Sequence, residues 1–217
     1  MFRIPITLLN YQTVVTSPPS SCMSGVVLQE LLTEFLEVWL HNIVYICNIY
    51  PSQIFRSRYK YCVNVKQSTY PPLNNYLRKL VLSMQTQLAQ QAIHSITVNI
   101  YNGLQTEESF LLLLSYPPQH LPTSPLSPEE CVAQCKDAFR SHVTSVLHSQ
   151  SQSPREVVEQ GRGFSVSMRT SELAGSQLTE WCSETVQEEM GAVTPFLFSD
   201  VGPLRMQSLH RQGAVST

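Results

Sequence analysis

A long apolar segment between Gly25 and Tyr50 constrains the fold of this chain more than any other feature. Leucine, isoleucine, phenylalanine and tryptophan side chains recur in it at steps of three and four residues, which predicts an α-helix. The apolar stripe is so wide that protein has to cover the helix on nearly every side. Three glutamates within the segment argue against a membrane span. The sequence therefore predicts a buried central helix that ends at Tyr50-Pro51, because proline cannot donate a backbone hydrogen bond.

Shorter periodic segments follow this helix and indicate the fold class. Asn102-Gly103 is a turn signal between two apolar, strand-like runs, so these runs predict an antiparallel hairpin. Ser127 and Glu130 form a capping-box pattern around Pro128, which predicts the start of a third helix. Three helices interleaved with such strands predict an α+β fold, with the helices packed on a mainly antiparallel sheet. We expect the later helices at 71–88 and 128–148, and strands at 61–66, 96–100, 110–114 and 164–169.

Charge and cysteine usage argue against several classes of function. The formal net charge is −2, and the local basic cluster of Arg56, Arg58 and Lys60 is too small to neutralise many phosphates. We therefore expect no direct nucleic-acid binding. Six cysteines are scattered through a chain large enough to fold without disulfides, so a reducing compartment is expected. Cys131 and Cys135 lack further ligands at metal-binding spacing, and they are interpreted as buried thiols.

Familiar catalytic motifs are absent from the sequence. It contains no HExxH, GxSxG or P-loop motif, and no block of paired acidic residues follows a predicted strand. His41 lies in the central helix and is interpreted as a core histidine rather than a general base. We therefore predict a binding protein without catalytic residues, metal ions or cofactors. An unrecognised small enzyme is the alternative from another class, and it would require a cleft with clustered titratable residues.

The two ends of the chain are predicted to differ from its centre. Residues 1–24 begin with a short apolar stretch that mimics a signal peptide, but Pro5 and Asn10 interrupt it. They are interpreted as a flexible N-terminal extension ahead of one domain at 25–217. From Ser171 onward the periodicity weakens, and the polar tail after Arg205 shows no alternating strand.

Several short strings match a known family in order and spacing. With them the chain resembles the HORMA-domain family, and within it the adaptor subunit of translesion DNA polymerase ζ. The resemblance implies a HORMA fold with a core at 25–170 and a mobile C-terminal segment at 171–217, the belt, that closes over a partner peptide. The matching strings are Glu34-Phe35-Leu36-Glu37-Val38, Val44-Tyr45, Tyr50-Pro51, Ile54-Phe55, Tyr61 with Val63 and Val65, Leu73-Asn74 with Tyr76, Pro117-Pro118, Ala138-Phe139, and Phe164-Ser165-Val166 with Thr170.

The resemblance also implies the partners and the binding residues. The expected ligand is a proline-containing peptide of the polymerase ζ catalytic subunit, held between belt and core by strand addition and aromatic contacts. Further implied partners are the deoxycytidyl-transferase translesion polymerase, activators of the anaphase-promoting complex and break-repair factors. The expected location is the nucleus, with the cytoplasm and spindle as further sites. The residues at peptide-contacting positions are Tyr76, Tyr50, Phe164, Phe196 and Leu197, where Phe196 corresponds to a belt tryptophan.

Two features of the sequence depart from the pattern of the family: one residue pair and the C-terminal tail. Lys136 and Asp137 occupy the face that pairs with another HORMA protein, where the family has a neutral residue followed by arginine. The family ends in a strand that locks the belt, whereas the tail after Arg205 is polar, so weaker locking is expected here. The second candidate function is that of the spindle-checkpoint branch, which uses the same belt on kinetochore and anaphase-promoting-complex ligands. The string Tyr50-Pro51 with Ile54-Phe55 favours the polymerase adaptor.

Overall fold

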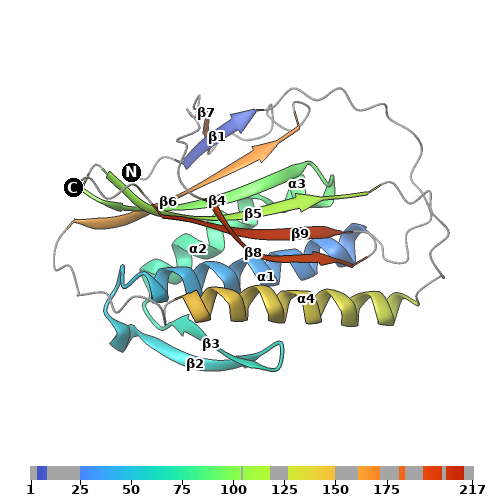
Figure 1. The fold of residues 1–217 in the computed structure, drawn as a ribbon, viewed down its shortest axis with the longest axis horizontal. Coiled ribbons are helices and arrows are strands. Elements are labelled where there is room, and N and C mark those ends of the chain that lie inside the picture. The colour runs from blue at the N-terminus through green and yellow to red at the C-terminus, as the bar shows by residue number, and fades with distance from the viewer. Residues whose placement is uncertain are drawn as a thin grey trace.

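The computed structural model describes residues 4–8, 25–103, 105–117, 127–149, 161–171, 181–183, 193–201 and 204–212. In these ranges helices α1 and α4 run side by side along one face of a seven-stranded sheet (Figure 1). This α+β arrangement agrees with the predicted fold class. The helices are α1 (Gly25–Ile46), α2 (Pro71–Ser83), α3 (Gln85–Ala89) and α4 (Pro128–Ser149). The strands are β1 (Ile4–Leu8), β2 (Phe55–Lys60), β3 (Val63–Ser68), β4 (Ile93–Asn102), β5 (Gln105–Ser115), β6 (Arg162–Thr170), β7 (Trp181–Ser183), β8 (Val193–Asp200) and β9 (Arg205–Gln212).

Helix α1 is the centre of the hydrophobic core, as its wide apolar stripe predicts. It contacts α2, α3, α4 and β3, and most of its apolar side chains are fully buried. The rings of Phe35 and Phe139 stack with their centroids 4.5 Å apart, which fixes α1 against α4. The helix ends at Ile46, before the predicted boundary at Tyr50, and Asn48 then turns the chain with a positive φ of 49°.

Helix α4 begins at the predicted capping box. The backbone N–H of Ser127 donates to Glu130 Oε2 at 2.8 Å, and the backbone N–H of Glu130 donates to Ser127 Oγ at 3.2 Å. The hydrogen bond from the Ser127 backbone N–H, and after it one from the Ser127 side chain, lower the pKa of the Glu130 carboxyl. The two residues therefore satisfy donors that the start of a helix leaves unpaired.

The large sheet has the strand order β7-β1-β6-β4-β5-β9-β8. Strand β4 pairs antiparallel with β5 across the turn at Asn102-Gly103, which confirms the predicted hairpin, and with β6 on its other side. Gly103 has a φ of 62°, a region that glycine adopts without steric cost. Strands β9 and β8 extend the sheet beyond β5, and β1 and β7 extend it beyond β6.

Strands β2 and β3 form a separate hairpin that lies against α1, and β2 is not among the strands that the sequence predicted. Its two turn residues, Tyr61 and Cys62, have positive φ values of 49° and 59°, as a two-residue hairpin turn requires. The hydroxyl of Tyr61 donates to Glu34 Oε1 at 2.9 Å, and its ring packs edge-on against Phe139. These contacts offset the conformational cost of placing tyrosine in this turn.

Residues 4–8 form strand β1, although sequence analysis placed them in a flexible extension. The strand pairs in parallel with β6 on one side and with β7 on the other. Its short length and its proline, Pro5, concealed the strand pattern in the sequence, because proline cannot donate to a ladder. The expectation of flexibility is therefore corrected for these residues, and the remainder of 1–24 lies outside the described residues.

The polar tail forms strand β9, which corrects the expectation that the chain lacks a locking strand. It pairs antiparallel with β5 and with β8. Met206, Ser208 and His210 alternate toward the buried face. Two of these three residues are polar, so hydrophobic alternation could not reveal the strand.

Cys131 and Cys135 are both buried on α4. Cys135 is a free thiol whose pKa burial raises to about 11. Cys131 forms a disulfide whose other half lies outside the described side chains, so the prediction of a free thiol there is wrong. The described residues contain no group of three or more potential ligands that would hold a metal ion. None of the described helices is long and apolar enough to cross a membrane.

Candidate functional site

Four aromatic residues gather where the end of α1, the start of α2 and strand β6 come together. We call Tyr50, Tyr70, Tyr76 and Phe164 the aromatic group. The Tyr76 and Phe164 rings meet edge to face at 5.7 Å, and the Tyr50 and Tyr70 rings are 6.3 Å apart. Tyr50, Tyr76 and Phe164 are half-buried, and Tyr70 is 44% exposed. The structure thus brings three of the predicted binding residues into one partly open surface.

Burial favours the neutral phenol forms of Tyr50 and Tyr76 in the aromatic group. Burial raises the pKa of Tyr76, and the neighbouring Tyr50 raises that pKa further. Burial and the neighbouring Tyr70 likewise raise the pKa of Tyr50. The group therefore offers uncharged aromatic faces with hydroxyl groups, a surface suited to apolar or proline side chains in an extended segment.

Strand β6 presents a partly unpaired edge beside these rings. Its inner edge pairs with β4 along the whole of Arg162–Thr170, but its outer edge pairs with β1 only at Met168–Thr170. Among the described residues, no strand pairs with the outer edge at 162–167. Phe164 lies on this stretch. Unpaired backbone donors and acceptors at a sheet edge are a template for the addition of a further strand.

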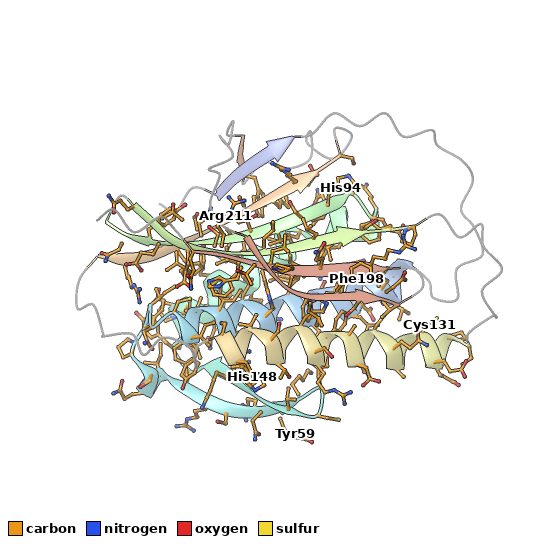
Figure 2. All side chains as sticks on the ribbon, viewed as in Figure 1. Tyr59, His94, Cys131, His148, Phe198 and Arg211 are labelled. Atoms are coloured by element: carbon orange, nitrogen blue, oxygen red, sulfur yellow. The ribbon has the colours of Figure 1, made fainter. Side chains whose placement is uncertain are left out.

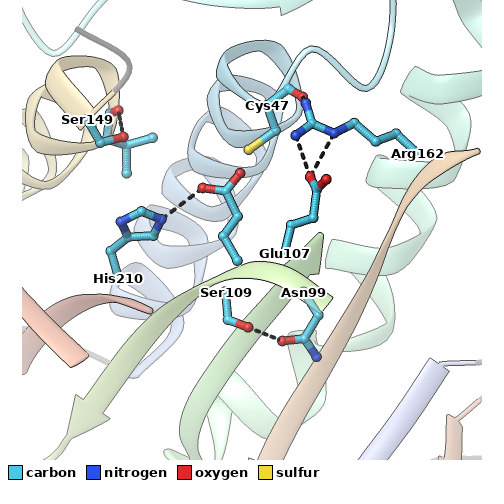
Figure 3. A network of polar contacts seen from close by, with 9 residues as sticks. Cys47, Asn99, Glu107, Ser109, Ser149, Arg162 and His210 are labelled. Atoms are coloured by element: carbon cyan, nitrogen blue, oxygen red, sulfur yellow. Dashed lines mark hydrogen bonds and ion pairs between the residues drawn. The ribbon is translucent and has the colours of Figure 1, made fainter. Parts of the chain in front are cut away.

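A buried ion pair anchors the first residue of this edge (Figure 3). The Arg162 side chain, only 9% exposed, donates from Nε to Glu107 Oε2 at 2.9 Å and also from Nη2 to the same oxygen. Its Nη1 donates to the backbone oxygen of Cys47 at 2.9 Å. Glu107 Oε1 accepts a further hydrogen bond from Asn102 Nδ2 at 2.9 Å. The network joins β6 and β5 to the end of α1, and so fixes the start of the unpaired edge.

Strand β7 is fixed to α2 through a tryptophan that sequence analysis did not single out. The indole Nε1–H of Trp181 donates to Ser83 Oγ at 3.0 Å, and Trp181 is buried. The chain has two tryptophans, and Trp181 is the one that lies in the belt. A tryptophan in an otherwise polar stretch was the only available signal, because such a large ring is usually buried in the folded protein.

Strand β9 docks on the core through two buried polar contacts and one ring stack. His142 Nδ1 and Ser208 Oγ are 2.5 Å apart, and burial lowers the pKa of His142 to about 4. His210 Nε2 lies 2.9 Å from Glu108 Oε2, and the His210 ring stacks on Phe110 with centroids 4.6 Å apart. The tail is therefore held by specific polar partners as well as by strand pairing.

The belt has strands at both edges of the large sheet. Strand β7 lies next to β1 at one edge, whereas β8 forms the opposite edge beyond β9 (Figure 1). The chain therefore passes from one edge to the other between Ser183 and Val193. A segment between β6 and β7 has the core on one side and the belt on the other.

The other predicted site residues lie away from the aromatic group. Leu197 is on β8, which β4, β5 and β9 separate from β6, so the structure does not bring it to Tyr76. The Phe196 side chain lies outside the described residues. Lys136 and Asp137 are exposed on α4, where Asp137 pairs with Arg140 at 3.0 Å.

Solved structures with a similar backbone identify the fold of the protein. A chain in the crystal structure of the mitotic checkpoint complex matches with a TM-score of 0.74 and 15% identity, over 88% of this chain and 98% of that one. HTP-2 bound to HTP-3 motif-6 matches with a TM-score of 0.66 and 10% identity, over 91% and 95%. The fold is that of HORMA-domain proteins. No protein-family model matches the sequence.

Curated relatives then narrow the class. The mitotic spindle assembly checkpoint protein MAD2B of Danio rerio is 37% identical over 95 residues, 43% of this chain and 45% of the relative. The Homo sapiens protein of that name is 34% identical over 126 residues, 58% and 54% of the two chains. DNA polymerase zeta subunit 2 of Drosophila melanogaster is 26% identical over 134 residues, 61% and 65%. This chain is a homologue of these proteins, and it spans about half the length of the first relatives it matches.

Proposed function

We propose that this chain is a non-catalytic nuclear adaptor that encloses an extended, proline-containing segment of the polymerase ζ catalytic subunit between strand β6 and the belt. One observation carries the proposal: the position next to β6 accepts a strand that is covered on its far side by β7. A partner segment there pairs its backbone on both sides, and it leaves when the belt opens.

The unpaired stretch of β6 and the aromatic group support this choice of ligand. Main-chain pairing along 162–167 supplies affinity for any extended segment, whereas neutral aromatic faces select proline and aliphatic side chains. The name of the Drosophila relative, DNA polymerase zeta subunit 2, points to the polymerase as the partner. The HTP-2 structure contains a bound motif, which fits a peptide ligand for this fold.

The test is a binding titration with a fluorescent proline-containing peptide from the polymerase ζ catalytic subunit. Tyr76→Ala removes a ring from the aromatic group, and we expect it to weaken binding by at least tenfold. Tyr59→Ala is the matched control, because Tyr59 is 73% exposed on the β2–β3 hairpin and points away from the sheet (Figure 2). Absence of binding to the unmodified chain would reject the function. Equal loss in both variants would reject the aromatic group as the site.

The adaptor role also requires surfaces that bind further proteins, and two exposed surfaces, on β8 and on α4, are candidates. On strand β8, Phe198 is 61% exposed at the sheet edge, and we propose this edge for the second translesion polymerase (Figure 2). Lys136 and Asp137 on the outer face of α4 are the proposed contact for a second HORMA protein. Charge reversal at Lys136 would weaken such pairing and leave peptide binding unchanged.

A checkpoint role is the second candidate, favoured by the names of the vertebrate relatives, which are mitotic spindle assembly checkpoint proteins. The same enclosure would then act on segments of anaphase-promoting-complex activators. Titration with a peptide from such an activator, beside the polymerase peptide, discriminates the two roles by relative affinity.

A further inference from the structure

The strand that occupies the position between β6 and β7 belongs to the chain itself. In β1, Ile6 is paired on both sides, with Met168 of β6 and with Ser183 of β7. Thr7 and Leu8 continue along β6, and Ile4 and Pro5 continue along β7. Figure 1 shows β1 in this place, at the edge of the sheet where β7 ends the strand order.

We propose that residues 4–8 are an internal ligand that fills the peptide site and that a partner has to displace. The proposal rests on the proposed function, because it assigns the same site its occupant. The segment has the chemistry expected of a partner: an extended run in which aliphatic Ile4 and Ile6 flank Pro5. An external ligand of this site is therefore an extended aliphatic segment that contains proline and runs parallel to β6.

The pairing of β1 is limited enough to be exchanged. It pairs with β6 at Ile6↔Met168, Thr7↔Arg169 and Leu8↔Thr170, although β6 extends over nine residues. Pro5 has no N–H, so the segment has one donor fewer than another strand of its length. A ladder of so few main-chain hydrogen bonds is correspondingly weak.

A partner can use the part of the site with which no described strand pairs. The unpaired stretch of β6 at 162–167 continues the edge that β1 occupies, and Phe164 lies within it. A longer segment would pair with this stretch and would also reach Tyr76, which packs against Phe164. The internal ligand therefore competes successfully with short or poorly matched segments, whereas a long segment displaces it.

Because an external ligand has to displace the internal one, its apparent affinity for the site is lowered. A site that is free in only a fraction of molecules has an apparent dissociation constant raised by the inverse of that fraction. Occupancy of 90 to 99% by the internal ligand, taken as an order-of-magnitude range, weakens external binding by roughly 10- to 100-fold.

The experiment uses the full chain and its Ile6→Asp variant, because aspartate at a position paired on both sides disfavours the strand. The probes are two fluorescent peptides, one of residues 1–10 of this chain and one from the polymerase ζ catalytic subunit. We expect Ile6→Asp to bind both peptides at least tenfold more tightly than the unmodified chain. Thr13→Asp is the control outside the strand, and a chain that begins at residue 10 is a second variant.

The outcomes separate this inference from the proposed function. Equal affinity of the full chain and Ile6→Asp for the polymerase peptide would overturn the internal ligand and leave the adaptor function standing. Binding of neither peptide to any variant, with circular dichroism showing folded protein, would overturn both. Hydrogen exchange gives an independent readout, since the internal-ligand model predicts that the polymerase peptide accelerates exchange of the amides of Ile6 and Leu8.

Discussion

At the scale of single residues, Arg162 fixes the start of the β6 edge at 162–167. Its removal takes the ion pair from Glu107 and the Arg162 hydrogen bond from the Cys47 carbonyl. Loss of one member of a largely buried pair costs about 3 kcal/mol. We therefore expect Arg162→Ala to lower the free energy of unfolding by about 3 kcal/mol in urea titrations.

Arg205→Ala is the matched control for that measurement. Arg205 pairs with Asp200 at 2.7 Å, but both side chains are more than 40% exposed, so the pair contributes less than about 1 kcal/mol. Equal destabilisation by the two substitutions would show that the buried Arg162 pair contributes no more to stability than the exposed Arg205 pair.

His142 makes the stability of the fold depend on pH. Burial lowers the pKa of His142 from 6.5 to about 4, and the same cause lowers the pKa of His41 to about 4. The unfolded chain therefore binds more protons between these values, and stability is full above pH 6.5 and falls as the pH approaches 4. Between pH 7 and pH 5 we expect each histidine to remove about 2 kcal/mol.

The measurement is urea unfolding at pH 7, 6 and 5 for the unmodified chain and for His142→Gln. Glutamine does not titrate, so the variant should lose roughly half as much stability over this range, with His41 supplying the remainder. A pH dependence that is unchanged in His142→Gln would contradict the assignment.

Individual residues also explain what the sequence could and could not predict about the site. Tyr76 and Phe164 were found through family resemblance, since their spacing alone fits ordinary core packing. Trp181 was missed because its neighbours are polar, and the role of a lone aromatic ring depends on which strand reaches it. The contacts of Ser208 and His210 join residues far apart in the chain, which no local pattern contains.

At the scale of elements, the turn of the β2–β3 hairpin carries conformational cost. Cys62 has a φ of 59° and an exposed side chain, so the residue gains little from its position. Glycine adopts this region freely, and we expect Cys62→Gly to stabilise the protein by about 1 kcal/mol in thermal or urea unfolding.

The reverse substitution tests the same principle in the other hairpin. Gly103 has a φ of 62°, and a Cβ there would meet nothing within 4 Å, so Gly103→Ala changes backbone strain without a clash. We expect it to destabilise by about 1 kcal/mol. Effects of the same sign in the two turns would contradict the argument.

Elements differ in how well their own sequence defines them. The helices and the β4–β5 hairpin were mostly predictable, because wide apolar stripes, a capping box and an Asn-Gly turn are local signals. The expected single helix at 71–88 is the exception, since it breaks at Met84 into α2 and α3. Strand β2 has a mostly exposed surface and β1 is a short strand with proline, so neither shows hydrophobic alternation. Such strands form because partner edges are available, which is a property of the tertiary fold.

At the scale of the whole molecule, we expect the docking of β9 to set how long the belt stays closed under the proposed function. His210→Ala leaves Glu108 buried without this partner and removes the stack on Phe110, at a cost of about 2 kcal/mol. We expect faster hydrogen exchange in β9 and, under the adaptor function, dissociation of bound peptide that is about tenfold faster or more.

Arg211→Ala is the control, because Arg211 follows His210 on the same strand and its side chain points to the opposite face. Unaltered exchange of the β9 amides in His210→Ala would show that strand pairing alone holds the tail. Faster exchange of the β9 amides with an unchanged rate of peptide dissociation would show that the docking of β9 does not control peptide release.

The parallel arrangement of β1 between β6 and β7 has a mechanical consequence. Tension applied along a segment in this position loads the hydrogen bonds of both neighbours in shear, so that they resist together instead of tearing one after another. A linkage of this kind withstands pulling far better than its equilibrium strength suggests. Under the proposed function, a partner segment in the same position would be held in the same way.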